Sequence, residues 1–173
     1  MLEFNKSYSD SKKILDELLI GSGVVLFRDV FSIDEINDAR EIVNKFADNQ
    51  EQKETHFNAE AEEAGTIHLQ QRVWNLFGKA KVFSTLITHD IIFDLMTKFL
   101  GTEFICGSYC ASRLLPGAVG QEPHIDYPYW DFYNKETFPM GLNSSFPQNC
   151  QVTIPLDVCS ELSGATAYYP GTQ

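Results

Sequence analysis

The segment with the clearest chemical potential is Gln121-Glu-Pro-His124-Ile-Asp126, in which an imidazole and a carboxylate stand two positions apart. The alternation of residues predicts a strand over 122–127. On a strand, residues i and i+2 project from the same face, so His124 and Asp126 would lie side by side. Such a pair supplies two of the three protein ligands of the 2-His-1-carboxylate site that holds non-haem Fe(II). The alternative is a surface strand with two solvent-facing polar residues, which so short a motif does not exclude.

Helical signals dominate the chain before residue 101. Apolar residues recur at helical spacing after two capping signals, Ser9–Ser11 and the capping box of Ser32 with Glu35. A third helix over 89–100 is expected to end at Gly101, in the left-handed conformation that glycine adopts readily. The intervening sequence predicts three further segments: a short strand over 24–27, a loop or frayed helix over 48–66 and a partly extended stretch over 72–76.

Beyond residue 101 the apolar pattern changes to a period of two. It predicts strands over 104–115, 122–127, 151–156 and 165–169, with turns at Pro116–Gly117 and Pro170–Gly171. A long aromatic loop over 128–148 separates the second strand from the third. Helices followed by strands favour an α+β fold with a sandwich or barrel core, in a single domain spanning 1–173.

Composition excludes several classes of partner. Thirteen Lys and Arg stand against 24 Asp and Glu, so the 173-residue chain has a formal net charge of −11. This charge disfavours nucleic acid and anionic membrane surfaces, because both require clustered basic residues. No apolar run approaches the roughly 20 residues that a membrane span needs. The four cysteines form no CxxC pair, so we expect reduced, mostly buried thiols in a cytoplasmic protein.

Several segments in a fixed order connect the motif to a known family. These are GVVLFRDVFSIDEI, RVWNLFGKAKVF, FLG, LLPG, QxxHxD and IPLD…SGATAYYPGT. In their order and spacing the chain resembles, almost end to end, the phytanoyl-CoA dioxygenase family of Fe(II)/2-oxoglutarate-dependent oxygenases. The resemblance implies a double-stranded β-helix core (a cupin-like jelly-roll) with flanking N-terminal helices. It also implies that His124 and Asp126 are the first two iron ligands. Because halogenating relatives replace the carboxylate with a small residue, the presence of Asp126 points to hydroxylation or a related oxidation. The resemblance further implies a small organic metabolite or acyl derivative as the substrate.

Further residues acquire candidate roles from this resemblance, each with a structural alternative. Gln121 could orient the site by hydrogen bonding, or be an ordinary turn residue. Arg72 and Thr153 could contact 2-oxoglutarate, although a surface arginine and a strand threonine require no such role. The candidates for the substrate pocket are Tyr127, Tyr129, Trp130 and Asn75. The three aromatic residues could equally pack their loop onto the core.

The sequence departs from the family pattern in its last part. The family's third ligand is a later histidine, followed by an arginine for 2-oxoglutarate, yet no His follows Asp126 and no Arg follows Arg113. We expect a C-terminally truncated domain with an incomplete barrel, inactive as this isolated chain; a natural short protein completed by a partner is the alternative. Unpaired strand edges would then favour a homodimer or higher oligomer.

Two other functions compete with the oxygenase. One is a non-catalytic fragment or binding module with the same jelly-roll fold. The other is a cupin-type metal protein such as an isomerase, which would need a histidine cluster that this sequence does not contain.

Overall fold

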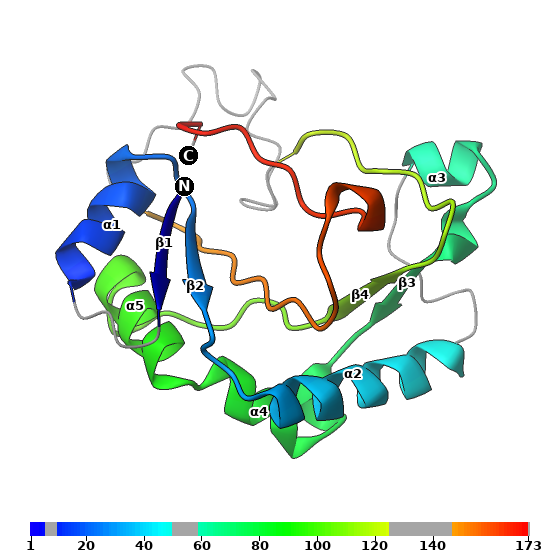
Figure 1. Cartoon of the computed structure of the whole chain (residues 1–173), viewed down its shortest axis with the longest axis horizontal. Helices are drawn as coiled ribbons and strands as arrows, with labels where there is room; N and C mark the ends of the chain where they lie inside the picture. The colour runs from blue at the N-terminus through cyan, green and yellow to red at the C-terminus, as the bar shows by residue number, and fades with distance from the viewer. Residues whose placement is uncertain (6–9, 50–58, 125–146, 173) are drawn as a thin grey trace.

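The computed structural model describes residues 1–5, 10–49, 59–124 and 147–172, and shows an α+β protein (Figure 1). The described part contains four short strands in two separate two-stranded sheets. In chain order the elements are β1 (Leu2–Asn5), α1 (Ser11–Ile20), β2 (Val25–Arg28), α2 (Ile33–Asp48), α3 (Ala59–Glu63), η2 (Ile67–Leu69), β3 (Gln70–Val73), η3 (Leu76–Gly78), α4 (Lys81–Ile87), α5 (Asp90–Leu100), β4 (Ala111–Leu114) and η4 (Glu161–Ser163).

The first sheet forms one end of the molecule, together with α1 and α5. β1 and β2 pair in parallel, from Leu2 opposite Val25 to Asn5 opposite Arg28. Asp10 caps α1, because its side chain accepts a hydrogen bond from the Lys13 backbone N–H. The apolar faces of these elements bury a cluster made of Phe4, Ile14, Leu18, Leu95 and Met96. The sequence had predicted both helices and the strand at β2, and all three are confirmed, whereas β1 was not predicted.

The second sheet lies beside α2 and α4. The capping box predicted for α2 is present, since Ser32 Oγ accepts from the Glu35 N–H while the Glu35 carboxylate accepts from the Ser32 N–H. β3 and β4 pair antiparallel, from Gln70 opposite Leu114 to Val73 opposite Ala111. These elements bury the second cluster, which consists of Ala39, Val43, Ala47, Val73, Leu76, Phe83 and Leu86.

Helix α4 was not predicted from the sequence. Its N-cap residue Ala80 has no side-chain hydrogen bond to the helix, so the usual start signal is missing. Its side chains nevertheless include the two largest fully buried ones in the described residues, Phe83 and Leu86. Tertiary packing, rather than a local capping signal, therefore accounts for this helix.

The prediction of one long strand over 104–115 is wrong, because only Ala111–Leu114 forms a ladder. Phe104 packs with the cluster of the first sheet, whereas Tyr109 packs with the cluster of the second. The segment between them therefore crosses from one core to the other. Residues 105–108 between these two anchors are exposed, and among the described residues no strand pairs with them.

The strands predicted over 151–156 and 165–169 are likewise not observed. Ile154 and Leu156 are half-buried against the second cluster, so the alternation marks their burial although no ladder forms. Tyr168 and Tyr169 are exposed. Of the strand predicted over 122–127, residues 122–124 are not in a strand and the remainder lies outside the described residues. Within the described residues the few strands form no closed barrel.

The end of α5, the cysteines and the lengths of the helices bear on three further expectations. Gly101 ends α5 with a positive φ of 94°, but its ψ of 175° is not the left-handed helical conformation. The four cysteines are free, as expected, yet Cys106 and Cys159 are exposed, so "mostly buried" was wrong. In the described part of the chain, no helix combines the length and apolar character needed to cross a bilayer. The single-domain organisation and the oligomeric state stay predictions.

Candidate functional site

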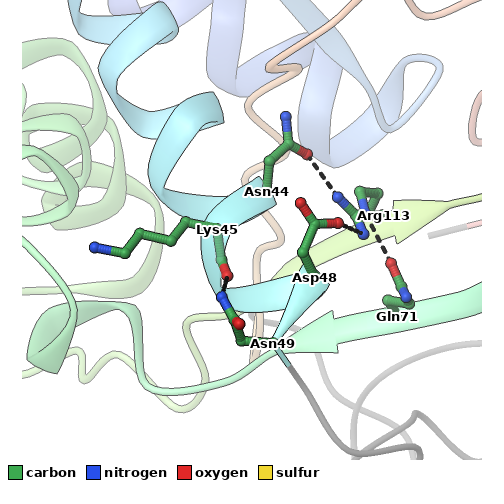
Figure 2. Close-up of polar contacts among 6 residues, drawn as sticks. All are labelled: Asn44, Lys45, Asp48, Asn49, Gln71 and Arg113. Atoms are coloured by element: carbon green, nitrogen blue, oxygen red, sulfur yellow. Dashed lines mark hydrogen bonds and ion pairs between the residues drawn. The ribbon is translucent and has the colours of Figure 1, made fainter.

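The two faces of the β3–β4 pair have different roles, because successive strand residues point to opposite sides. One face packs on α2: Val73 and Ala111 join the second apolar cluster. On the same face Arg113 donates three hydrogen bonds, to Gln71 Oε1 at 2.7 Å, Asn44 Oδ1 at 3.1 Å and Asp48 Oδ1 at 2.6 Å (Figure 2). The Arg113 guanidinium therefore links the β3–β4 sheet to the last turns of α2 and holds the sheet in place against that helix.

The opposite face carries Gln70 and Arg72 from β3, opposite Leu114 and Ser112 of β4. Arg72 is half-buried; its Nη1 lies 3.3 Å from Cys110 Sγ, and its guanidinium carbon lies 5.4 Å from the centroid of the Trp74 ring. Leu114 lies against the turn at Gly164, where a Cβ atom would come within 2.8 Å of Leu114 Cδ1. The fold therefore brings the SGAT segment, far away in sequence, onto the face that holds Arg72.

The connection from β4 to the QxxHxD motif folds back over the start of β3. The Leu115 N–H donates to the Leu69 carbonyl at 2.9 Å, which extends the ladder by one step. A tight turn follows, in which the Ala118 N–H donates to the Leu115 carbonyl at 3.0 Å. Gly117 has a φ of 90°, as the third position of a type II turn with Pro116 in second position requires. The predicted Pro-Gly turn is confirmed.

His124 is exposed at the end of this connection, and its ring nitrogen Nδ1 lies 2.6 Å from the Glu122 carbonyl oxygen. A carbonyl oxygen only accepts hydrogen bonds, so Nδ1 must carry the proton and donate it. In the neutral ring the lone pair available to a metal is then on Nε2. Metal-binding histidines typically donate their other ring N–H to a backbone carbonyl or a carboxylate in this way. The donor chemistry of His124 thus fits a metal ligand.

The other residues expected at the metal and substrate sites are placed only in part. Asp126, Tyr127, Tyr129 and Trp130 lie outside the described residues, so the predicted pairing of His124 with Asp126 stays a prediction. Among the residues that the structure describes, no group of three metal-binding side chains comes together. Gln121 is exposed within the Val119–His124 connection.

Neither Thr153, predicted in a strand, nor Asn75, predicted in a partly extended stretch, has the expected conformation. Thr153 is exposed and is not part of a strand. Asn75 is exposed and has a left-handed backbone (φ 54°, ψ 56°), and its carbonyl accepts from the Gly78 N–H at 3.1 Å to begin η3. Asn75 therefore does not share a face with the buried Val73. Their co-substrate and substrate roles stay predictions.

Two polar residues of this region were missed in the sequence. Gln70 is buried, and its Nε2 donates to the Val119 carbonyl at 2.6 Å. Arg113, described above, links three segments. The sequence signal was the succession of Gln70 and Gln71 on one strand, because neighbouring strand residues point to opposite faces. Gln71 must therefore lie on the α2-facing side, and Gln70 on the side of Arg72. Only their partners, 40 or more residues away, reveal the roles.

Within an α+β fold, the hydrogen bond of the exposed His124 leaves Nε2 available to a metal, which makes His124 a candidate metal ligand. A family model described as phytanoyl-CoA dioxygenase (PhyH) matches residues 21–173, nearly the whole chain. The chain belongs to this family, as the resemblance of its motifs had indicated. Membership suggests a dioxygenase-type enzyme. No curated protein and no solved structure matches the chain.

Proposed function

We propose that the chain is an Fe(II)/2-oxoglutarate-dependent oxygenase domain with a jelly-roll core, acting as a hydroxylase on a small organic metabolite or acyl derivative. The observation that carries the proposal is the hydrogen bond from His124 Nδ1 to the Glu122 carbonyl, in a member of this family. This bond selects the tautomer whose Nε2 can bind a metal.

In this proposal His124 and Asp126 hold the Fe(II) ion. An imidazole with a carboxylate suits Fe(II) and leaves further coordination positions for a co-substrate and O₂. When bound, Fe(II) supplies the activation of O₂ that couples decarboxylation of 2-oxoglutarate to hydroxylation of the substrate. The contribution of the chain's own residues is to hold these ligands in geometry and to exclude bulk water.

Arg72 is the proposed partner of a 2-oxoglutarate carboxylate, because a planar guanidinium binds carboxylates through paired hydrogen bonds. Its contacts with Cys110 and Trp74 restrict the side chain on the face opposite α2. Gln121 and Thr153 are proposed to complete this co-substrate site. Tyr127, Tyr129, Trp130 and Asn75 are proposed to line the substrate pocket. Four free thiols suit a reducing compartment, and we propose a cytoplasmic location.

The test uses Mn(II) as an air-stable paramagnetic substitute for Fe(II) and follows the ring signals of the four histidines by NMR. We expect Mn(II) to broaden His124 at lower concentration than His56, His68 or His89. The variant Asp126→Ala should raise the required concentration by at least about tenfold, because it removes one of the two assigned ligands. His89→Asn is the matched control, since His89 caps α5 and asparagine is also a good capping residue.

The spectroscopic test is an anaerobic titration with Fe(II) and 2-oxoglutarate. Only two protein ligands are assigned, so we expect a weak or absent visible charge-transfer band for this chain. A strong band that requires both His124 and Asp126 would show a complete site and contradict the expected inactivity. If Asp126→Ala does not change the Mn(II) concentration that broadens His124, the proposed iron site is wrong and a non-catalytic module with the same fold is favoured.

A further inference from the structure

Gln70 is the one polar residue among the described residues that is buried, with an exposed fraction of 6%. Its side-chain amide donates from Nε2 to the Val119 carbonyl at 2.6 Å. The two residues are 49 positions apart in the sequence. A buried amide is costly unless it is hydrogen-bonded, so this contact offsets the burial of both polar groups.

The contact fixes the chain shortly before the candidate metal ligand. Upstream of Val119, the Leu115 N–H is bonded to the Leu69 carbonyl and the Pro116–Gly117 turn is closed by the Ala118 N–H. These bonds direct the chain back across the beginning of β3, where Gln70 holds Val119. Five residues later comes His124, whose ring orientation depends on the carbonyl of Glu122 in the same short connection.

We infer that Gln70 is a positioning residue for His124: its buried amide fixes the backbone at Val119 and thereby the course of the chain that orients the imidazole. The consequence for metal binding rests on the proposed function. The effect of the Gln70–Val119 hydrogen bond on the orientation of the His124 ring does not depend on it. Without the amide donor, the 119–124 connection would lose its hydrogen bond to β3 at Val119. The Nδ1–Glu122 hydrogen bond would then form in a smaller share of molecules.

The neighbouring Gln71 provides a matched control on the same strand. Its Oε1 accepts from Arg113 Nε at 2.7 Å on the opposite face, toward α2. The substitutions Gln70→Leu and Gln71→Leu are chemically identical, and each removes one long-range hydrogen bond of β3. Only the first severs the link to Val119. General loosening of the sheet should therefore affect both variants, and loss of positioning only one.

The experiment measures two quantities in the full chain, wild type and both variants. The first is amide hydrogen exchange over 118–124 together with the ¹⁵N-detected tautomer of His124. The second is the Mn(II) concentration that half-broadens the His124 ring signal. For Gln70→Leu we expect about tenfold faster exchange over 118–124 and a partly mixed tautomer. We also expect about a tenfold higher Mn(II) requirement, as is typical when the support of a metal ligand is removed. Gln71→Leu should leave the exchange rate, the tautomer and the Mn(II) requirement unchanged.

Gln70→Asn keeps the amide but shortens the side chain, so it should act in the same direction as Gln70→Leu and serves if the leucine variant does not fold. Equal effects of the Gln70 and Gln71 substitutions, or none from Gln70, would overturn the inference. If Mn(II) does not broaden wild-type His124, the proposed metal site fails. The positioning role of Gln70 is then tested by amide exchange over 118–124 and by the His124 tautomer alone. A change confined to the Gln70 variants supports the role, and no change overturns it.

Discussion

Substitution of Arg113 by methionine tests how the sheet is attached to α2. Methionine keeps an unbranched apolar side chain over the sheet but removes all three donors, to Gln71, Asn44 and Asp48. The side chain of Arg113 is 21% exposed and that of Asp48 is 66% exposed. The three contacts therefore differ in how strongly water competes with them.

The magnitude follows from these exposures. The bonds to Gln71 and Asn44 are half-buried, so we assign about 1 kcal/mol to each, the typical net value of a protein hydrogen bond. The ion pair with the exposed Asp48 carboxylate adds about 0.5 kcal/mol. Arg113→Met should thus lower the free energy of unfolding by about 2.5 kcal/mol. For a chain of this size that corresponds to a fall in Tm of roughly 5–10 °C.

Urea denaturation followed by circular dichroism measures this loss, with Asp48→Asn as the comparison. The Asp48 variant should lose no more than about 1 kcal/mol, and its effect should shrink as salt is raised, because exposed charges are screened. A double-mutant cycle isolates the coupling between Arg113 and Asp48. If Asp48→Asn costs as much as Arg113→Met, the ion pair dominates and the assignment of most of the energy to the two amide contacts is refuted.

Three further predictions follow from local contacts. Ser32→Ala should lower the free energy of unfolding by about 1 kcal/mol in chemical denaturation, since it removes the N-cap of α2; an unchanged value would contradict the importance of the capping box. Burial raises the pKa of Tyr109 to about 12, above its ordinary value of 10.0. The unfolded state therefore ionises first, so stability should be complete below about pH 10 and fall between pH 10 and 12, and a Tyr109→Phe variant with the same fall would refute this. Burial also raises the pKa of the Cys150 thiol, so iodoacetamide should label it at pH 8 more slowly than the exposed Cys106 and Cys159, and equal rates would contradict the structure.

Local signals in the sequence were sufficient for the helices that carry their own caps. Asp10 and the Ser32–Glu35 box each satisfy backbone N–H groups within a few residues, so both helix starts could be read directly. Helix α4 has no such cap and depends on Phe83 and Leu86, whose partners are distant in sequence. Its existence could not be inferred from local chemistry.

The strand predictions failed for a related reason. Alternation reports which side chains are buried, and it did so correctly for Ile154 and Leu156. A strand also requires a neighbouring backbone for its hydrogen bonds, and alternation does not indicate whether one is present. Within residues 104–110, only Phe104 and Tyr109 contact the two apolar clusters, while residues 105–108 between them are exposed and form no ladder.

The sequence by itself determined the family and the identity of the candidate ligands His124 and Asp126, because the order and spacing of the motifs are local properties. The tautomer of His124 was decided by the fold of 122–124, which brings a carbonyl oxygen to Nδ1. Only the tertiary structure determines what holds the chain before the QxxHxD motif. Gln70 binds Val119, and Arg113 links β4 to α2. A glutamine or arginine gives no sequence signal of its partner, since the partner is chosen only when the chain has packed and water has been removed from both groups.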